Sequence, residues 1–368
     1  MKISNFTVLL IGMALIVPGT SLADTTFKLP IRQKWVTKLK KEKFITPRPY
    51  QYSTPAITED VVYVGTMRGE VYALQAKSGK KLWDTRLSSS IYAEPVVNGT
   101  SVYVADRKGT LYALEKTTGK IEWQVDTMAE ISARPLIADD TIYVTTVLKQ
   151  LFAIDKLGRG RKWQTSKFGH LPKMTIKGSS SPVIYNGRIY VGYSDGTFIC
   201  YGAEDGGVIW AKQLSDKNAR FTDISGTPLI VNDVIYISSV DGQAFALDPK
   251  DGVVIWSTDR GGPNDVAYED GRLFISGGGT VSALDAASGA LVWEQKLVDQ
   301  VETSPPAVKD GVVVVVSTKD KIFALDAKTG EIKLNRYLGR GTFGHPVIVD
   351  KTLYIFTNSS HMHAFRGS

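Results

Sequence analysis

Histidine and cysteine are the side chains that could most readily hold a metal ion or act as a nucleophile, and this sequence contains few of them. Its 368 residues include four histidines and one cysteine. His361 and His363 stand two residues apart, so on a strand they would share one face and could begin a metal site. No third ligand is spaced near them, and we predict no bound metal. Cys200 has no disulfide partner within the chain, so we expect it to be a small buried core residue.

Other catalytic patterns are also missing from the sequence. It contains no nucleophile elbow, no HExxH pattern and no glycine-rich loop that leads into a helix and could cradle a phosphate. The run 277–279 is Gly-Gly-Gly, but it lies between predicted strands and is interpreted as a turn. We therefore predict a protein with no catalytic residues, no metal and no cofactor.

Most of the chain repeats a unit of four short strands. In residues 227–256, apolar alternation and turn residues predict strands at Pro228–Val231, Val234–Ser238, Gln243–Asp248 and Val253–Thr258. The same order of features recurs from Thr54, Glu94, Arg134 and Ser181, with weaker copies at 265–293 and 306–334. One such sheet cannot bury both of its faces alone, so the copies must pack against one another.

The period and the count of strands predict the architecture. Trp83, Trp123 and Trp163 follow one another at 40 residues, and a period near 40 with four strands is typical of a propeller blade. Ile31–Leu39 reads as a fourth strand with no first three, and Pro346–Phe365 as three strands with no fourth. We predict an all-β, eight-bladed β-propeller of four-stranded antiparallel blades. Its N-terminal strand joins the last blade and closes the ring, which leaves no open sheet edge.

The first 23 residues have the features of a signal peptide. Lys2 provides a basic start, Val8–Val17 an apolar run too short to span a bilayer, and Ser21–Ala23 a small-x-small cleavage site. We expect cleavage after Ala23 and one exported propeller domain over residues 24–368, in a bacterial periplasm. The segment contains no cysteine, so we expect no lipoprotein anchor.

Positive charge is concentrated near the N-terminus. The formal net charge is +7, and residues 28–43 hold seven basic residues against Glu42. The simpler interpretation is a solvated face on the closing strand. The alternative is weak contact with anionic membrane or an acidic partner, to which each basic residue near a lipid surface would contribute about 1 kcal/mol. An exported protein whose remaining charge is near zero is not expected to bind nucleic acid.

Connector length indicates where a partner could bind. The next first strand begins 12 residues after Trp83, but 19 after Trp163 and 18 after Trp210. A third long connector follows the N-terminal strand. The connectors 164–181 and 211–227 flank one predicted blade and should emerge on the same face of the disc. Insertions on one face of a repeat fold are where binding usually occurs.

The repeat resembles that of quinoprotein-type (PQQ-like) eight-bladed propellers. The stretch ALDPKDGVVIW spaces Ala246, Gly252 and Trp256 as in that family, in which the Trp docks against the adjacent blade. Quinoprotein dehydrogenases of this fold also carry adjacent cysteines and a calcium site of carboxylate and Asn ligands. A chain with one cysteine cannot supply the first of these.

The two long connectors resemble those of BamB, the propeller subunit of the machinery that assembles outer-membrane β-barrels. In that family the first connector has an apolar-x-apolar-basic-Gly pattern, which Met174, Ile176 and Lys177 fit. The second has acidic residues before Thr-Pro; Asp223 fits one of them, whereas Ser225 stands at the other. The resemblance implies that these connectors dock the periplasmic domains of the barrel-assembly subunit. The candidate partner-binding residues are Met174, Ile176, Lys177, Arg220, Phe221 and Asp223.

These observations predict a non-catalytic periplasmic scaffold that resembles BamB and assists outer-membrane protein assembly as a monomer within a complex. The first alternative is a PQQ-dependent or other redox-active enzyme that uses the axial funnel, whose mouth His345, Glu94 and Arg134 are expected to line. The second is a different partner-binding PQQ-like propeller. Asp223 has an alternative of its own, since a carboxylate at that place could instead bond the backbone of its connector.

Overall fold

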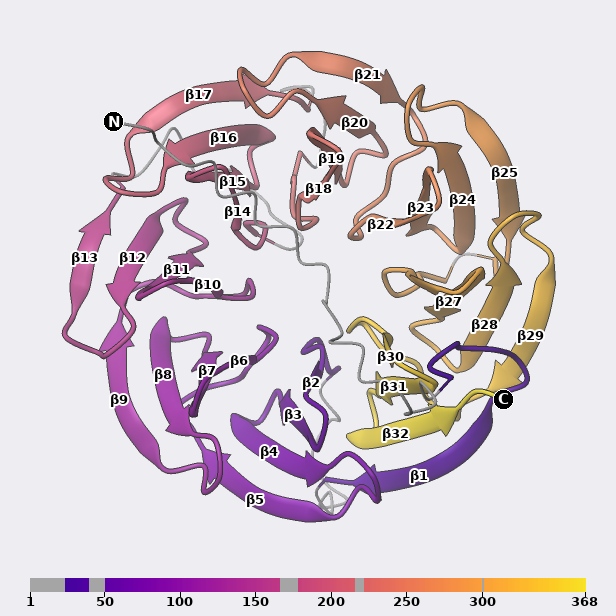
Figure 1. The fold of residues 1–368 in the computed structure, drawn as a ribbon, viewed down its shortest axis with the longest axis horizontal. Coiled ribbons are helices and arrows are strands. Elements are labelled where there is room, and N and C mark those ends of the chain that lie inside the picture. Colours follow the sequence, from indigo (N-terminus) through magenta and orange to yellow (C-terminus); the bar gives the residue numbers. More distant parts are fainter. Residues whose placement is uncertain (1–23, 40–49, 166–177, 216–221, 300) are drawn as a thin grey trace, which may run out of the picture.

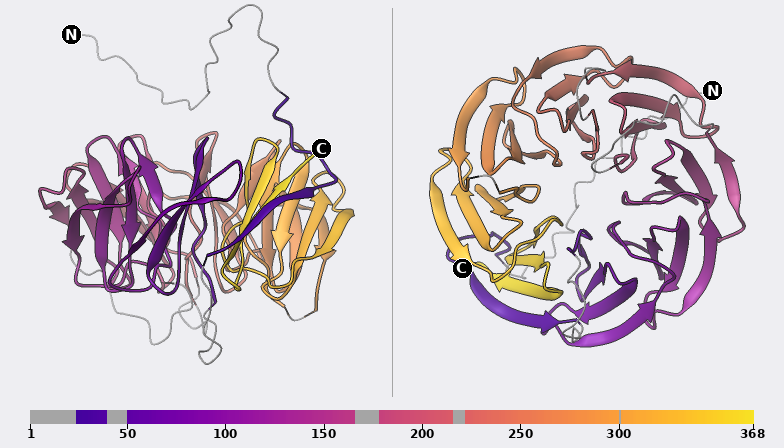
Figure 2. Two further views of the ribbon diagram at one scale, coloured as in Figure 1. Left: turned by 90° about the horizontal axis from the view of Figure 1, so that it is seen from below. Right: turned by 180° about the vertical axis from the view of Figure 1, so that it is seen from behind.

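The structure is a closed ring of eight antiparallel sheets, as the repeat predicts. This computed structural model describes residues 24–39, 50–165, 178–215, 222–299 and 301–368. Within them lie eight four-stranded sheets, arranged as the blades of a propeller (Figure 1). Figure 2 shows the resulting disc from its edge and from behind. We number the blades 1 to 8 from β2, so that blade 8 consists of β30, β31, β32 and β1.

Each blade presents a short inner strand to the axis, followed by a longer second strand. The inner strands are β2 (Ala56–Ile57), β6 (Val96–Asn98), β10 (Leu136–Ala138), β14 (Val183–Tyr185), β18 (Leu229–Val231), β22 (Ala267–Glu269), β26 (Ala307–Lys309) and β30 (Val347–Val349). The second strands are β3 (Val61–Gly65), β7 (Ser101–Ala105), β11 (Thr141–Thr145), β15 (Arg188–Gly192), β19 (Val234–Ser238), β23 (Arg272–Gly277), β27 (Val312–Val316) and β31 (Thr352–Phe356).

The third and outer strands complete each sheet. The third strands are β4 (Glu70–Gln75), β8 (Thr110–Glu115), β12 (Leu151–Asp155), β16 (Thr197–Gly202), β20 (Ala244–Leu247), β24 (Thr280–Asp285), β28 (Lys321–Asp326) and β32 (His361–Arg366). The outer strands are β5 (Lys81–Arg86), β9 (Ile121–Asp126), β13 (Arg161–Gln164), β17 (Val208–Gln213), β21 (Val254–Thr258), β25 (Leu291–Lys296), β29 (Ile332–Tyr337) and β1 (Arg32–Lys38).

The core lies between blades, on both faces of the second and third strands. All five residues of β7, β11 and β12 are buried, whereas the outer strands are largely exposed. One apolar cluster, for example, joins Tyr63 and Trp83 of blade 1 to Val102 and Leu114 of blade 2. The continuous apolar runs of the second strands are therefore explained by contacts with a neighbouring blade on each side.

A tryptophan and a glycine join seven of the eight pairs of neighbouring blades; between blades 7 and 8, Leu334 takes the place of the tryptophan. The Trp83 indole N–H of blade 1 donates to the Lys116 carbonyl of blade 2 at 3.0 Å, and its ring covers Gly119. A Cβ on Gly119 would lie 2.4 Å from that ring, and its φ of +74° also favours glycine. The same pairing occurs at Trp35–Gly79, Trp123–Gly158, Trp163–Gly206, Trp210–Gly252, Trp256–Gly289 and Trp293–Gly330. The Trp docking implied by the repeat is thus confirmed.

The ring closes through the two ends of the described chain. Strand β1 pairs antiparallel with β32, from Arg32 opposite Arg366 to Lys38 opposite His361. The Ser368 amide donates to the Lys28 carbonyl at 3.1 Å. We call this joint the closing seam. The prediction that the N-terminal strand completes the last blade is confirmed, within one residue at each end of the expected strand.

A second segment, residues 50–54, also crosses from blade 8 to blade 1. The Gln51 backbone amide donates to the Asn358 side-chain oxygen at 2.9 Å, and the Gln51 side-chain amide donates to the Ser360 hydroxyl at 3.2 Å. The Tyr52 ring stacks on Phe343, with ring centroids 4.9 Å apart. The role of this segment leaves no local pattern in the sequence, because its contacts join residues about 300 positions apart.

Candidate partner-binding face and axial cavity

Five of the six predicted partner-binding residues lie outside the described part of the chain. They are Met174, Ile176, Lys177, Arg220 and Phe221. Asp223 is described, as are the exits of both long connectors, 178–181 and 222–224. The geometry of those exits therefore defines where the two connectors rejoin the disc.

Both exits are held at blade 4. On the first connector, the Ser179 hydroxyl donates to the Thr146 carbonyl at 3.0 Å, while the Ser180 amide donates to the Gly192 carbonyl at 2.9 Å. The first exit is thus bonded to blades 3 and 4 together.

The second exit is bonded to the turn that follows β15 in blade 4. The Thr222 hydroxyl donates to the Ser194 carbonyl at 2.9 Å, and the Ile224 amide to the Tyr193 carbonyl at 3.1 Å. Gly192 ends β15, and Tyr193 and Ser194 follow it directly in the turn that leads to β16. One short stretch of blade 4 therefore holds the described ends of both connectors, which brings them together as the sequence predicted.

Asp223 is fully buried. Its backbone carbonyl accepts a hydrogen bond from the Val240 amide at 2.9 Å. The ordinary connectors make the same bond, from Arg107 to the Ser90 carbonyl at 2.9 Å and from Val147 to the Glu130 carbonyl at 3.0 Å. The backbone of Asp223 thus follows the ordinary repeat, and its side chain is buried rather than exposed on the face of the disc.

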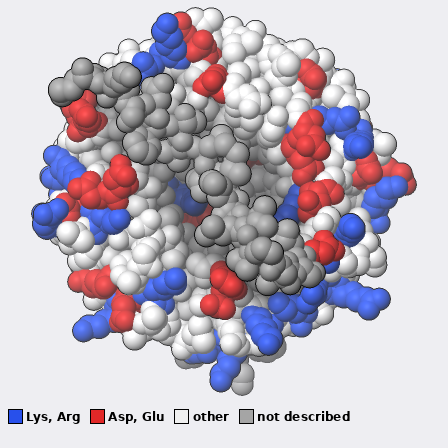
Figure 3. Space-filling model, viewed as in Figure 1, with Lys and Arg blue, Asp and Glu red and all other residues white. Residues whose placement is uncertain are grey.

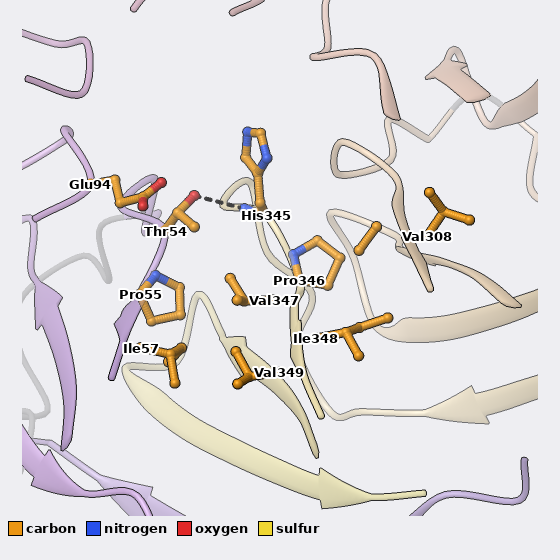
Figure 4. Close-up of a pocket in the computed structure, with 11 residues that line it drawn as sticks. Thr54, Pro55, Ile57, Glu94, Val308, His345, Pro346, Val347, Ile348 and Val349 are labelled. Carbon is orange, nitrogen blue, oxygen red and sulfur yellow. Dashed lines mark hydrogen bonds between the residues drawn. The ribbon is translucent and has the colours of Figure 1, made fainter. Parts of the chain in front are cut away.

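A cavity of about 390 Å³ opens at the centre of the ring, bounded by blades 7, 8, 1 and 2 (Figure 4). Its lining consists of Thr54, Pro55, Ile57, Glu94, Ala307, Val308, His345, Pro346, Val347, Ile348 and Val349. Eight of the eleven lining residues are apolar, although polar atoms form the larger part of the exposed wall. Glu94, Thr54 and His345 lie together at one end of the cavity in Figure 4. Such a cavity could receive an apolar group with a polar end.

Ionisable side chains face one another at the polar end. Glu94 Oε1 lies 3.3 Å from Arg134 Nε, and His345 Nε2 lies 3.4 Å from Asp265 Oδ2. Burial raises the pKa of the Glu94 carboxyl to about 7, although Arg134 opposes this effect. The expectation that Glu94, Arg134 and His345 stand at the axis is consistent with this arrangement.

The histidine pair lies half-buried on β32, whereas the cysteine lies in the core of blade 4. The rings of His361 and His363 lie 6.1 Å apart, and His363 stacks on Phe365 with centroids 5.8 Å apart. Within the described ranges, no three His, Cys, Asp or Glu side chains are grouped so that they could hold a metal ion. Cys200 is fully buried, as expected, and burial raises the pKa of its thiol to about 11.

The basic segment 28–43 is described as far as Leu39. Arg32, Lys34 and Lys38 of β1 are exposed on the rim of the disc. Figure 3 shows Lys and Arg side chains gathered along the lower-right part of that rim, where β1 runs in Figure 1. Among the residues that the structure describes, none forms a helix of the length and hydrophobicity needed to cross a membrane.

Comparison with known families identifies the class of protein that this fold defines. A family model described as outer membrane protein assembly factor BamB matches residues 32–106, 92–248 and 240–368. The chain therefore belongs to the BamB family of propellers.

Curated relatives carry the same description over part of their length. The BamB protein of Alkalilimnicola ehrlichii is 28% identical over 203 residues, which is 53% of this chain and 53% of the relative. That of Kangiella koreensis is 25% identical over 204 residues, 54% of this chain and 53% of the relative. The chain thus spans about half the length of these curated relatives.

Two kinds of solved structure, a BamB and a dehydrogenase, share this fold. BamB from Moraxella catarrhalis superposes with a TM-score of 0.81 at 18% identity, covering 92% of this chain and all of that one. A europium-containing methanol dehydrogenase superposes with a TM-score of 0.75 at 14% identity, covering 91% and 93%. At these identities the likeness concerns the fold alone.

Proposed function

We propose that this protein is a non-catalytic scaffold that binds a protein partner during outer-membrane protein assembly, through the two long connectors beside blade 4. Membership of the BamB family supports the role. The observation that carries the location is the convergence of both connector exits on Gly192–Ser194. The proposed partner is the set of periplasmic domains of the outer-membrane barrel-assembly subunit, and the proposed compartment is the periplasm.

Apolar side chains of the connectors would supply most of the binding energy. Residues near the centre of an interface usually do so, whereas charges at its rim tune encounter and orientation. In the sequence, Met174, Ile176 and Phe221 are the apolar candidates, and Lys177 and Arg220 the charged ones. Asp223 would act indirectly, by holding the second connector against blade 5.

The test is a titration of connector variants against the purified periplasmic domains. Ile176→Ala or Phe221→Ala should weaken binding by about 1–3 kcal/mol if either is an anchor. Lys177→Glu should mainly slow association, and more so at low salt. Thermal melts should hardly change, because connectors contribute little to the core between blades.

A matched control is available on an ordinary connector. Met128 is 84% exposed between blades 2 and 3, so Met128→Ala removes an exposed apolar side chain away from the proposed surface. It should leave affinity unchanged. Wild-type affinity in a combined Ile176→Ala, Lys177→Glu, Phe221→Ala protein would exclude this face.

The same preparation tests the redox alternative. A quinone chromophore in the absorbance spectrum of the purified protein would favour an enzyme that uses the axial cavity. The residues around that cavity do not fit a quinone held over a calcium ion and adjacent cysteines. Cys200 is the only cysteine, and the described residues bring no three metal-binding side chains together. We therefore prefer the scaffold.

A further inference from the structure

A buried lysine occupies a place where several other blades have glycine, although blade 7 has Asp320 there and blade 8 has Ser360. The turn between the second and third strands ends with Gly69, Gly109, Gly196 and Gly242 in blades 1, 2, 4 and 5, with φ between +78° and +94°. In blade 3 the same place is taken by Lys149, with φ of +59°. The backbone bond is retained, since the Lys149 amide donates to the Thr146 carbonyl at 3.0 Å, as Gly69 does to Thr66 at 2.9 Å. Only the side chain differs.

That side chain forms an ion pair with the next blade. Lys149 is 1% exposed, and its Nζ contacts Asp195 Oδ2 in the corresponding turn of blade 4. A buried ammonium group is costly unless a carboxylate neutralises it, and the geometry of such a pair restricts how its two elements can sit. The pair therefore fixes the turn of blade 3 relative to the turn of blade 4.

These two turns are the ones that hold the long connectors. Thr146, in the turn of Lys149, accepts the bond from Ser179 on the first connector. Ser194, the neighbour of Asp195, accepts the bond from Thr222 on the second. A shift of one turn against the other would move one connector exit relative to its neighbour.

The place taken by Lys149 also lies close to the connector in two of the blades that have glycine there. A Cβ at Gly69 would lie 2.4 Å from the Ser89 carbonyl oxygen, and one at Gly109 would lie 2.3 Å from that of Ala129. In blades 1 and 2 the connector backbone thus passes directly over the glycine. Lys149 has a Cβ at this place, so a connector that followed the path seen in blades 1 and 2 would clash with it.

We infer that the Lys149–Asp195 ion pair is the positioning element that sets the spacing of the two connector exits, 178–181 and 222–224, where the proposed partner-binding connectors rejoin the disc. The identity of that partner rests on the proposed function, whereas the coupling of the connectors does not. Neither residue needs to touch the partner. Both act through the hydrogen bonds of their turns.

The test uses variants that break the pair without straining the turn. Lys149→Gly restores the residue that several other blades carry at this positive φ, and Asp195→Asn removes the charge with little change in volume. The charge-swapped protein, Lys149→Asp with Asp195→Lys, should recover part of what each single change loses. Arg107→Ala is the matched control, because Arg107 pairs with Glu130 at 2.7 Å between ordinary elements of blades 2 and 3.

The first readout is hydrogen–deuterium exchange of the free protein. Amides of 178–181 and 222–224 should exchange several-fold faster in Lys149→Gly and Asp195→Asn, and at the wild-type rate in the control. Unchanged exchange in both variants, with melts that show folded protein, would overturn the inference.

The second readout is affinity for the periplasmic domains of the barrel-assembly subunit. Each variant should bind about threefold to tenfold more weakly, the coupling expected of residues in one network. If wild-type protein does not bind those domains, the proposed function fails, and the exchange comparison still decides the coupling. Faster exchange without loss of affinity would retain the positioning role and place the partner elsewhere.

Discussion

The closing seam and the ordinary joint between blades 1 and 2 use the same side-chain contacts under different chain connectivity. Trp35 and Trp83 are each 8% exposed, and they donate to backbone carbonyls at 2.9 and 3.0 Å. Within an ordinary blade, however, the outer strand follows the third strand through a tight turn, so the two cannot separate. At the seam, β1 reaches β32 only by pairing between distant parts of the chain.

The seam compensates with contacts that ordinary joints do not need. The Phe27 amide donates to Asp310 at 2.7 Å, and Lys351 pairs with Asp24 at 2.7 Å. Segment 50–54 adds the bonds of Gln51 to Asn358. No covalent turn joins β1 to β32, so hydrogen bonds and an ion pair from the segments on both sides of β1 hold this strand in the last blade.

The largest expected effect is from opening the seam. Trp35→Ala should cost about 3–5 kcal/mol in free energy of unfolding, as for other large buried aromatic side chains, and Trp83→Ala should cost a similar amount. Chemical denaturation measures both. Hydrogen exchange then separates them, because only Trp35→Ala should lose protection at the β1–β32 pairing.

Deletion of residues 24–39 is the more severe form of the same test. It removes the outer strand of blade 8 and exposes the edge of β32, so the melting temperature should fall. An unchanged melting temperature would show that the ring does not depend on the seam.

The next effect concerns the glycine beneath each tryptophan. Gly119 and Gly99 both have positive φ, of +74° and +60°, but only Gly119 lies against a ring. Gly99→Ala should cost about 1–2 kcal/mol, the conformational penalty alone. Gly119→Ala should cost distinctly more, because its Cβ would clash with Trp83. Equal losses in denaturant unfolding would show that the tryptophan adapts freely.

A smaller effect concerns how the free energy of unfolding depends on pH through a histidine at the seam. Burial, with help from His361 and Arg336, lowers the pKa of His363 from 6.5 to about 4, and His363 is paired opposite Val36 of β1. Between those two values the unfolded chain binds the proton and the folded chain does not. Stability is therefore complete above pH 6.5 and falls as the pH drops towards 4.

Unfolding free energies measured from pH 7 to pH 4 check this expectation. The His363→Leu protein should lack this part of the decline, while other groups contribute equally to both proteins. Parallel pH profiles for the two proteins would contradict a role for His363.

The fold could be predicted because every blade repeats one local pattern. The expected strand Val234–Ser238 has the bounds of β19, and Gln243–Asp248 differs from β20 (Ala244–Leu247) by one residue at each end. Alternation, turn residues and the Trp period act within about 40 residues, so sequence alone reveals them. The closure followed from counting strands.

The candidate site could be predicted only in outline. Connector length indicated the face, but not that Asp223 is buried, since its burial depends on blade 5. Lys149 left a visible signal, a lysine where several other copies have glycine. Its partner Asp195 lies 46 residues further along, and only the packing of blades 3 and 4 brings the two together.

The smallest effect asks whether the seam has a surface role besides stability. Arg32, Lys34 and Lys38 are exposed on β1, and the sequence places three more lysines among residues 40–43. If this charge attracts anionic membrane, changing Lys38, Lys40, Lys41 and Lys43 to Gln should abolish binding to anionic vesicles. Each lysine near such a surface contributes about 1 kcal/mol, and exposed charges are screened beyond about 10 Å at 0.1 M salt. A co-sedimentation assay at low and high salt measures the binding.

The control exchanges four exposed lysines elsewhere on the disc for Gln, namely Lys108, Lys120, Lys250 and Lys328. Equal binding by both quadruple variants would assign any attraction to overall charge, and wild-type protein that ignores anionic vesicles at low salt would leave the seam with its structural role alone.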